Sequence, residues 1–480
     1  MKEACDRLPG GAGVTQSPTT SLGLVASLYL LEASGLLAML AVYRNGDKPL
    51  RLLMTGKDSP FFLAGLLGVL GCSVYLVTRY RRTFIGQRRK FWLTVAMNIA
   101  TVALAFLTGE ATARLLTSST PAGPVVLNTP LLPRSWDAAV ARNRELLERV
   151  PSNISYFVPD GSLGWTIGPS RQSKDGLYFS SSEGIRSAGP NVSYAARSVM
   201  HRVATVGDSF TFGLEVRFED SWPARLEQLL GSQVQVLNFG VDGYGVDQAY
   251  LRYSRDVRQW HPELVLLGLI RHDLYRSLAV YSFVSFPEWG FPFAKPRFVV
   301  DAGMLRLLNV PVPSPQEILS RRTIADLPFV EFDPGYHPSE WDWRAYHRSR
   351  LIRLVLSRFR RWPEQNGRAT DQVATSLNGE IITSFASLAE REGTRPLVVF
   401  FPSRSDFGEA DQRVRNGVVT TLRARGIDYV DLAPCVSELD VSELFIQDRP
   451  HYSPKGNARV ATCLHSLVRD RLLRANLSRS

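Results

Sequence analysis

The sequence predicts an α/β protein whose central parallel sheet is covered by helices on both faces. Two observations support this fold class. From residue 201 onward, short apolar runs alternate with helix-like segments, and most of these runs contain few polar residues. Continuous apolar strands are typical of a parallel sheet that is buried on both sides. The expected strands are residues 202–206, 234–237, 264–268, 396–401 and 429–432, and the expected helices are residues 222–230, 248–259, 381–392, 411–425 and 457–473.

The first expected strand is followed directly by Gly207, Asp208 and Ser209, with Gly213 four residues further on. A serine at the carboxyl end of a strand, just before the positive end of a helix, lies where open α/β sheets bind ligands. Such a serine can act as a nucleophile when a base is nearby. The same residue types are common in surface turns, so this stretch alone leaves both interpretations open.

A candidate base lies near the other end of the chain, where Asp448 and His451 precede the last expected helix. A nucleophilic serine needs an imidazole to take its proton, and the imidazole needs a carboxylate to hold its tautomer. The alternative is a polar loop in which Ser453 caps the helix and Pro454 takes its first position. That cap would also hold His451 directly ahead of the helix.

Taken together, these stretches resemble the SGNH/GDSL hydrolase superfamily over roughly residues 160–475. That family carries an early Gly-Asp-Ser, a glycine block, a Gly-x-Asn-Asp block and a late Asp-x-x-His. Here the glycine block is residues 238–245, and the third block is residues 267–273, with His272 in place of the asparagine. Each motif alone is weak, but the four occur in the family's order. The resemblance implies a three-layer, flavodoxin-like parallel sheet.

The resemblance also implies roles for particular residues. Ser209 would be the nucleophile, His451 the general base and then acid, and Asp448 the orienting carboxylate. The oxyanion hole would be formed by the backbone N–H groups of Ser209 and Gly243, with Gly243 preferred over Gly240, and by the ring of His272 in place of the missing asparagine. Alternatively, His272 packs structurally. We expect Asp208 and Asp273 to support loops rather than react.

The overall charge is basic, with 56 Lys and Arg against 45 Asp and Glu. Such a balance can indicate nucleic acid or an anionic membrane surface. No nucleic-acid motif is visible, and much of the excess lies near apolar segments, so we expect a membrane rather than a nucleic acid as the partner. Glu219, Asp220 and Asp242 match no metal-binding loop, so we expect no metal. Nothing in the sequence implies a cofactor.

Three apolar segments near the N-terminus, at residues 22–43, 61–78 and 91–107, are each close to the length that crosses a bilayer. We therefore expect a disordered stretch over residues 1–20 and a transmembrane region over residues 21–110, although Glu32 weakens the first span. Six cations crowd the second connection and predict that it is cytoplasmic, so the chain after residue 110 would be periplasmic or extracellular. These cations are Arg79, Arg81, Arg82, Arg88, Arg89 and Lys90.

The rest of the chain is expected to comprise a stalk at residues 111–160 and a catalytic domain at residues 161–480. An insertion at about residues 275–375 is rich in aromatic residues, and it could form either a wall of the substrate site or a small satellite core. Residues 350–361 predict a basic amphipathic helix. That helix could touch lipid headgroups, but a solvated helix face is favoured.

None of the four cysteines is paired at metal-ligand spacing. Cys435 and Cys463 could form a disulfide if the catalytic region is exported, or they could be two buried thiols. The sequence slightly favours the buried thiols.

The function expected from these features is that of a membrane-anchored serine esterase. It would hydrolyse acyl esters, in the first place acetyl esters, of envelope carbohydrate or lipid. Two alternatives stay open: an O-acyltransferase acting on envelope glycans, and a catalytically weak domain that binds a glycan or a partner. The last alternative stays open because His272 stands where the family has an asparagine.

Overall fold

The computed structural model of the chain describes residues 19–44, 59–79, 88–120, 123–149, 155–195, 199–286, 293–358, 368–408 and 412–477. The chain forms two compact units, one from Met1–Arg134 and Pro338–Arg360, and the other from Ser135–His337 and Arg361–Ser480. Most of the expected disordered N-terminus, up to residue 18, lies outside the described residues. Residues 80–87 of the cationic connection also lie outside them.

The second unit is built around a five-stranded parallel sheet in the order β14-β13-β10-β8-β9. Numbered along the chain, this is the order 2-1-3-4-5 of flavodoxin-like sheets. The parallel sheet expected from the sequence is therefore confirmed, with each strand within a few residues of its predicted place. The strands are β8 (His201–Val206), β9 (Val234–Asn238), β10 (Leu264–Leu269), β13 (Arg395–Phe400) and β14 (Tyr429–Asp431).

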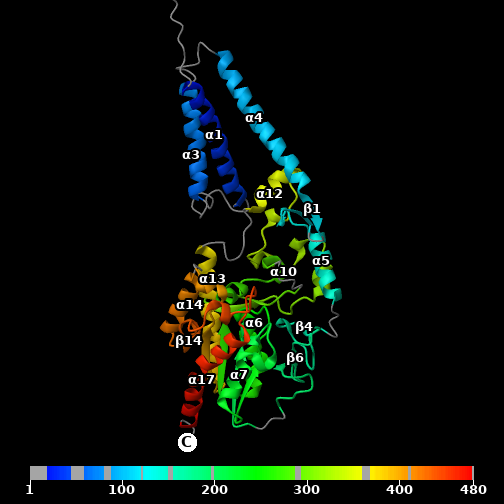
Figure 1. Ribbon diagram of the computed structural model, residues 1–480, viewed down its shortest axis with the longest axis vertical. Helices are drawn as coiled ribbons and strands as arrows, with labels where there is room; N and C mark the ends of the chain where they lie inside the picture. Colours follow the sequence, from blue (N-terminus) through cyan, green and yellow to red (C-terminus); the bar gives the residue numbers. More distant parts are fainter. Residues whose placement is uncertain are drawn as a thin grey trace, which may run out of the picture. The chain divides into compact units, whose positions relative to one another are not determined.

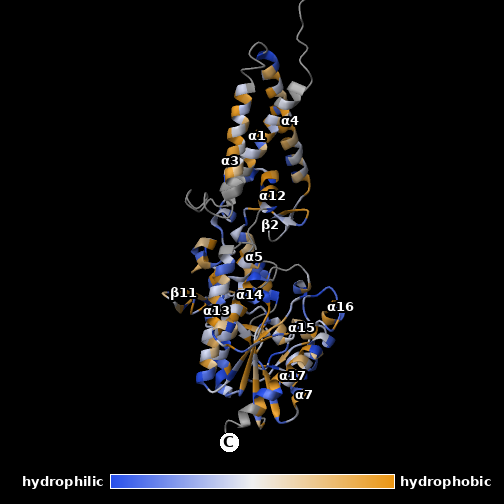
Figure 2. Ribbon diagram, turned by 90° about the vertical axis from the view of Figure 1, so that its left-hand side faces the viewer, coloured by the Kyte–Doolittle hydropathy of each residue, from blue (hydrophilic) through white to orange (hydrophobic). Residues whose placement is uncertain are grey.

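Both faces of this sheet are covered, because alternate residues of each strand enter two separate apolar clusters. In β10, Val265 and Leu267 belong to one cluster and Leu264 and Leu266 to the other. Figure 2 shows the apolar strands between α13 and α14 on one side and α7 and α17 on the other. The first cluster includes α8 (Val246–Arg252), α13 (Arg368–Arg391) and α14 (Arg413–Ala424), and the second includes α7 (Trp222–Leu230) and α17 (Pro454–Leu477).

Shorter elements surround this core. Tyr281, Phe283 and Phe293 of the aromatic insertion are buried, so for these residues the satellite-core interpretation is the better one. Trp289 and Phe291 lie outside the described residues. The hairpins are β4 (Phe157–Asp160) with β5 (Gly164–Ile167), β6 (Phe179–Ser180) with β7 (Arg186–Ser187), and β11 (Arg297–Asp301) with β12 (Met304–Leu308). The short helices are α5 (Trp136–Arg149), α6 (Ser209–Phe212), α9 (Arg271–Arg276), α10 (Ser282–Ser285), α11 (Pro315–Leu319), α15 (Ala433–Val436) and α16 (Val441–Leu444).

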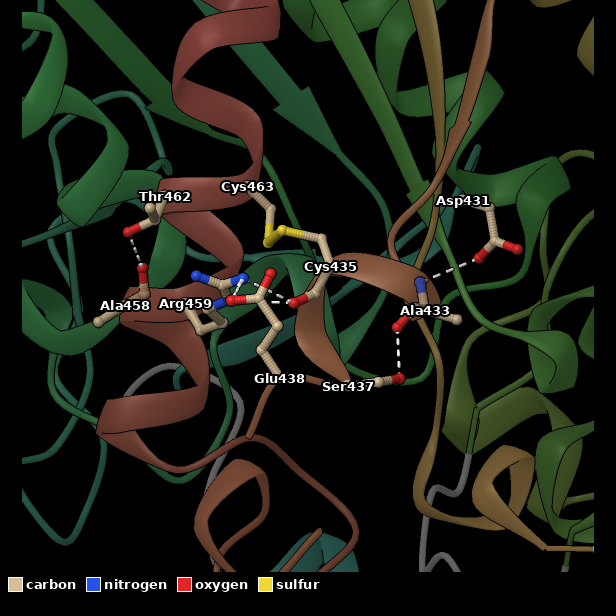
Figure 3. Close-up of a disulfide and its surroundings, with 9 residues drawn as sticks. All are labelled: Asp431, Ala433, Cys435, Ser437, Glu438, Ala458, Arg459, Thr462 and Cys463. Carbon is tan, nitrogen blue, oxygen red and sulfur yellow. Dashed lines mark hydrogen bonds and ion pairs between the residues drawn. A yellow bond between two sulfur atoms is a disulfide. The ribbon is translucent and has the colours of Figure 1, made fainter. Parts of the chain in front are cut away.

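A disulfide joins Cys435 of α15 to Cys463 of α17 (Figure 3). Arg459 of α17 also donates to the Cys435 carbonyl oxygen at 2.9 and 3.1 Å. The sequence favoured two buried thiols, and that preference was wrong. The two cysteines lie 28 residues apart, and only the packing of α15 against α17 brings their Cα atoms to 6.1 Å.

The first unit contains three long helices at the three expected apolar segments (Figure 1): α1 (Thr19–Arg44), α3 (Ser59–Arg79) and α4 (Arg88–Leu115). Among the described residues, only α4 is long and apolar enough to cross a membrane, judged by length and composition. The apolar parts of the other two, Val25–Leu36 and Leu63–Thr78, are shorter.

The first unit also takes in parts of the expected stalk and insertion. A small antiparallel sheet follows α4, formed by β1 (Thr117–Thr120), β2 (Gly123–Val126) and β3 (Thr129–Pro130). The basic amphipathic segment forms α12 (Arg350–Arg358), which packs against α4 and β3. The side chain of Arg353 is buried there and donates to the Leu131 and Leu132 carbonyl oxygens. The stalk and the insertion are therefore each divided between the two units.

Candidate active site

A cavity of about 1110 Å³ opens at the carboxyl ends of β8 and β10, where the strand order reverses. This is the position at which open α/β sheets bind ligands. Every site residue expected from the sequence lines it: Ser209, Gly243, His272, Asp448 and His451. Residues far apart in the sequence therefore meet in one place.

Ser209 begins the short helix α6 directly after β8. The carboxylate of Asp208 caps this helix by accepting from the Phe210 N–H at 2.9 Å. Gly207 is needed for the tight turn, since a Cβ there would lie 2.3 Å from the Gly268 carbonyl oxygen. The Ser209 side chain is thereby presented to the cavity, with its Oγ 3.0 Å from Nε2 of His451.

His451 is held by the loop that precedes α17. Its carbonyl oxygen accepts from the Ile446 N–H at 3.0 Å, which closes the loop. Arg404 spans the same loop from outside, donating to the carbonyl oxygens of Ile446 at 2.8 Å and Arg449 at 3.1 Å. The neighbouring Tyr452 is buried and donates to the Pro402 carbonyl oxygen at 2.6 Å. These hydrogen bonds together fix the loop that carries the His451 imidazole.

The carboxylate that contacts His451 is Glu215, at 3.0 Å from Nδ1. The sequence led us to expect Asp448 in this place. Asp448 lines the cavity but is exposed, and its backbone takes a left-handed conformation with φ of 56°. No sequence motif indicated Glu215, which lies six residues after Ser209 and 236 residues before His451.

Glu215 is itself tightly positioned. Its backbone has a φ of 68°, which is uncommon for a residue other than glycine, and its N–H donates to the Tyr178 hydroxyl at 2.8 Å. The fully buried Arg186 stabilises the same turn by donating hydrogen bonds to three carbonyl oxygens, at distances of 2.5–2.6 Å. These belong to Phe212, Gly213 and Val216. Burial lowers the pKa of Arg186 to about 10, so the guanidinium stays charged at neutral pH.

The glycine block supplies the other side of the cavity. Gly240 cannot serve as an oxyanion donor, because its N–H already donates to the Asn238 side chain at 3.0 Å. Gly243 lines the cavity and has a φ of 78°. Its turn is fixed by Trp165, whose indole N–H donates to the Asp242 carbonyl oxygen at 3.0 Å. His272 reaches the cavity from the first turn of α9.

A buried ionic network lies beneath the site. Arg276 contacts Asp273 at 2.6 Å and Asp208 at 3.2 Å. Asp273 also accepts from the Ile270 N–H at 2.9 Å, so both carboxylates support loops as expected. Burial raises the pKa of Asp273, and its neighbour Asp208 raises it further. Within the described ranges, no three His, Cys, Asp or Glu side chains gather closely enough to hold a metal ion.

Asp242 faces the cavity, and burial raises the pKa of its carboxyl above the ordinary value. A carboxyl whose folded pKa exceeds its unfolded value destabilises the fold when ionised, and this cost is absent below the unfolded pKa. We therefore expect Asp242→Asn to raise the Tm at neutral pH, on the order of 2–4 °C for each kcal/mol recovered. The difference from the parent should disappear toward about pH 4.

Thermal unfolding of both proteins across this pH range would measure the effect. The exposed Asp440→Asn is a matched control and should leave the Tm nearly unchanged. A Tm for Asp242→Asn below that of the parent at neutral pH would mean that the ionised carboxylate stabilises the site.

Comparison with known proteins gave matches among solved structures only. No family model matches the chain, and no curated protein matches it. A lipase/acylhydrolase from Enterococcus faecalis is 12% identical, with 57% of this chain and 97% of that chain covered and a TM-score of 0.31. A GDSL-like lipase from Bacteroides thetaiotaomicron is also 12% identical, with 57% and 93% covered and a TM-score of 0.30.

An acetyl-xylooligosaccharide esterase from Geobacillus Stearmophilus is 13% identical, with 56% of this chain and 93% of that chain covered and a TM-score of 0.31. These three solved structures are therefore a lipase/acylhydrolase, a GDSL-like lipase and an esterase.

Proposed function

We propose that the second unit is a serine esterase that works through a covalent acyl-enzyme. The observation that carries this proposal is the continuous line of contacts Ser209 Oγ–His451 Nε2–His451 Nδ1–Glu215 Oε2, with both hydrogen bonds at 3.0 Å. A nucleophile, a base and a carboxylate in this order have the geometry needed to activate a hydroxyl group. A surface turn would not require such a line inside a cavity.

In the first half of the reaction, His451 takes the Ser209 proton as Oγ attacks the carbonyl carbon of the ester. The carbonyl oxygen gains the negative charge, and the N–H groups of Ser209 and Gly243 and the ring of His272 are the proposed donors to it. The tetrahedral species then collapses. The bond to the leaving alcohol breaks, and His451 returns the proton to that alcohol. Water repeats the sequence on the acyl-enzyme and releases the acid.

We assign the orienting role to Glu215 rather than to Asp448, because Glu215 makes the contact with Nδ1. A carboxylate at this nitrogen keeps the proton on Nδ1, so that Nε2 is free to accept from Ser209, and it stabilises the imidazolium that forms. The hydrogen bond from the Glu215 N–H to the Tyr178 hydroxyl and the hydrogen bonds that Arg186 donates to the Glu215 turn support this role. Asp448, at the exposed rim of the cavity, is the alternative.

For the substrate, we propose an acyl ester of an envelope carbohydrate or lipid, in the first place an acetyl ester. The cavity is lined by many polar and charged side chains, among them Arg276, Arg404 and Ser403, which suits a hydroxyl-rich alcohol portion. Transfer of the acyl group to a glycan is the second candidate. It would require a wall that excludes water. The described aromatic residues of the insertion do not line the cavity, which favours hydrolysis.

We further propose that the chain is a multi-pass membrane protein with its catalytic unit in the periplasm or outside the cell. Only 6% of the apolar window of α4 is buried, as suits a helix surrounded by lipid rather than a core helix. The six cations at residues 79–90 favour a cytoplasmic connection before α4. The disulfide between Cys435 and Cys463 is typical of an oxidising compartment, which agrees with export.

The reaction is tested with an activated ester such as nitrophenyl acetate. The purified protein should release nitrophenol in a burst equal to the number of active sites, or at least turn the ester over, and Ser209→Ala should abolish this activity. An organophosphate-type probe should label Ser209, as mass spectrometry would show. The proposal fails if Ser209→Ala keeps its activity and no probe labels the residue. Added glycans distinguish transfer from hydrolysis, because transfer would yield acylated sugar.

The choice between the two carboxylates has its own test. Glu215→Gln should lower kcat on the order of 10²- to 10⁴-fold, because the amide no longer stabilises the imidazolium. Asp448→Asn is the matched comparison and should keep most of the activity. Steady-state kinetics at several pH values would measure both variants. The reverse ranking of the two variants would return the role to Asp448.

The role of His272 is tested in the same assay. If the ring donates to the oxyanion, His272→Ala should lower kcat on the order of 10²- to 10³-fold with little change in KM, because the contact is strongest in the transition state. His272→Asn should restore much of the loss, since the amide is also a donor. Parent-like activity of the alanine variant would show that His272 is structural.

A further inference from the structure

The amphipathic helix α12 and the residues before it are not used by the proposed chemistry. This segment, residues 338–358, comes from the middle of the catalytic region in sequence but belongs to the first unit, beside the end of α4 (Figure 1). The length of α4 up to its contact with this segment can be compared with the thickness of a bilayer. Its placement at a membrane rests on the proposal that α4 crosses a bilayer.

The length of α4 places Glu110 at a membrane boundary. The helix begins with Arg88, Arg89 and Lys90, and its apolar stretch starts at Phe91. Glu110 follows 19 residues later, which corresponds to about 29 Å at a rise of 1.5 Å per residue. The hydrocarbon core of a bilayer is about 30 Å thick. If the three cations mark one boundary, Glu110 therefore lies at the other.

α12 is bonded to α4 at this same level. The Glu110 carboxylate accepts from the Ser349 hydroxyl at 2.7 Å and from the N–H groups of Arg350 and Leu351 at 3.1 and 2.9 Å. It thus caps the first turn of α12, where N–H groups lack partners within the helix. One residue earlier, Gly109 gives space to Leu351, because a Cβ there would lie 2.9 Å from the leucine side chain. The start of α12 is therefore fixed at the boundary.

The surface around this point has the composition of a membrane interface. Trp343 and Tyr346 are 59% and 42% exposed, and Leu115 at the end of α4 is 87% exposed. Tryptophan and tyrosine are enriched at the level of lipid headgroups, where one part of the ring is apolar and the other is polar. Large exposed apolar side chains beside a membrane helix suit the boundary of the acyl chains.

The exposed positive charges of this segment suit the binding of lipid phosphate groups. The exposed cations near the end of α4 and along residues 338–358 are Arg114, Arg344, Arg348 and Arg358. The acids of residues 338–358 are Glu340, which is buried, and Asp342, which pairs with Arg344 at 3.3 Å. Cations close to a bilayer surface attract anionic lipids.

We propose that residues 338–358 form a membrane-docking segment that lies in the phospholipid headgroup layer of the bilayer crossed by α4. Trp343 and Tyr346 sit at the boundary between headgroups and acyl chains, and Arg344, Arg348 and Arg358 contact lipid phosphates. The chain passes between the two units near residues 134, 337 and 360. The second unit is therefore joined through three chain connections to the unit that contains α4 and the docking segment.

The test uses the full chain reconstituted in vesicles of phosphatidylcholine and phosphatidylglycerol. Cys5 and Cys72 are replaced by serine, which leaves the disulfide intact, and one cysteine is introduced for a maleimide fluorophore. The label at Trp343→Cys, and separately at Tyr346→Cys, should lose most of its fluorescence to a headgroup nitroxide lipid and little to aqueous iodide. Leu104→Cys in α4 and Leu473→Cys in α17 serve as references, since both side chains are exposed.

The reference positions separate the possible failures. If Leu104→Cys is not quenched by a nitroxide placed on the acyl chains, α4 does not cross the membrane, and the membrane part of the proposed function fails. If Leu104→Cys is quenched but Trp343→Cys and Tyr346→Cys respond to iodide in the same way as Leu473→Cys, the span stands and the docking segment is overturned. In that case Trp343 and Tyr346 contact water or another protein rather than lipid.

The phosphate contacts have a separate measurement. Replacing Arg344, Arg348 and Arg358 together by glutamine should reduce headgroup quenching of the Tyr346→Cys label and remove its dependence on salt. Replacing the exposed Arg306 and Arg469 by glutamine is the matched control and should change neither. Unchanged quenching in the triple variant would overturn the arginine contacts with lipid phosphate.

Discussion

The imidazole of His451, held between the hydroxyl of Ser209 and the carboxylate of Glu215, is the interaction on which the site depends. Its two partners lie 242 and 236 residues away in sequence, yet both contacts are 3.0 Å. They meet because the carboxyl ends of parallel strands share one edge of the sheet. The helices on both faces of the sheet hold the strands in place, and the segments that follow these strands line the cavity.

The contacts have to be kept in place by charged groups that are themselves buried. Arg186 binds three carbonyl oxygens around the Glu215 turn, and Arg276 pairs with two carboxylates beneath Ser209. Breaking such a buried network leaves an uncompensated charge, so each member strongly disfavours rearrangement. The left-handed backbone of Glu215 persists for the same reason, because its surroundings determine it. The proposed proton transfer requires a Glu215 turn that is rigid in this way.

The two units place their apolar residues in opposite ways. In the second unit the apolar residues of the strands face inward on both sides of the sheet, whereas α1, α3 and α4 leave large apolar side chains exposed. Apolar residues that face outward along whole helices suit lipid, and those enclosed by other elements suit water. Residues 338–358 combine buried and exposed side chains: Arg353 is buried, and its guanidinium lies 5.5 Å from the ring of Trp343, which is 59% exposed. That combination distinguishes this segment from a simple surface loop.

The sequence by itself determined the parallel α/β class, the five strands, and the serine and histidine that meet in the cavity. These depend on local patterns: continuous apolar runs, a glycine turn after β8, and a capped helix after His451. Tertiary structure alone decided that Glu215 rather than Asp448 contacts the imidazole, that Cys435 pairs with Cys463, and that residues 338–358 join the first unit. Each depends on which distant segments come together, because a carboxylate, a thiol or an amphipathic helix has the same local signature whichever partner the packing brings to it.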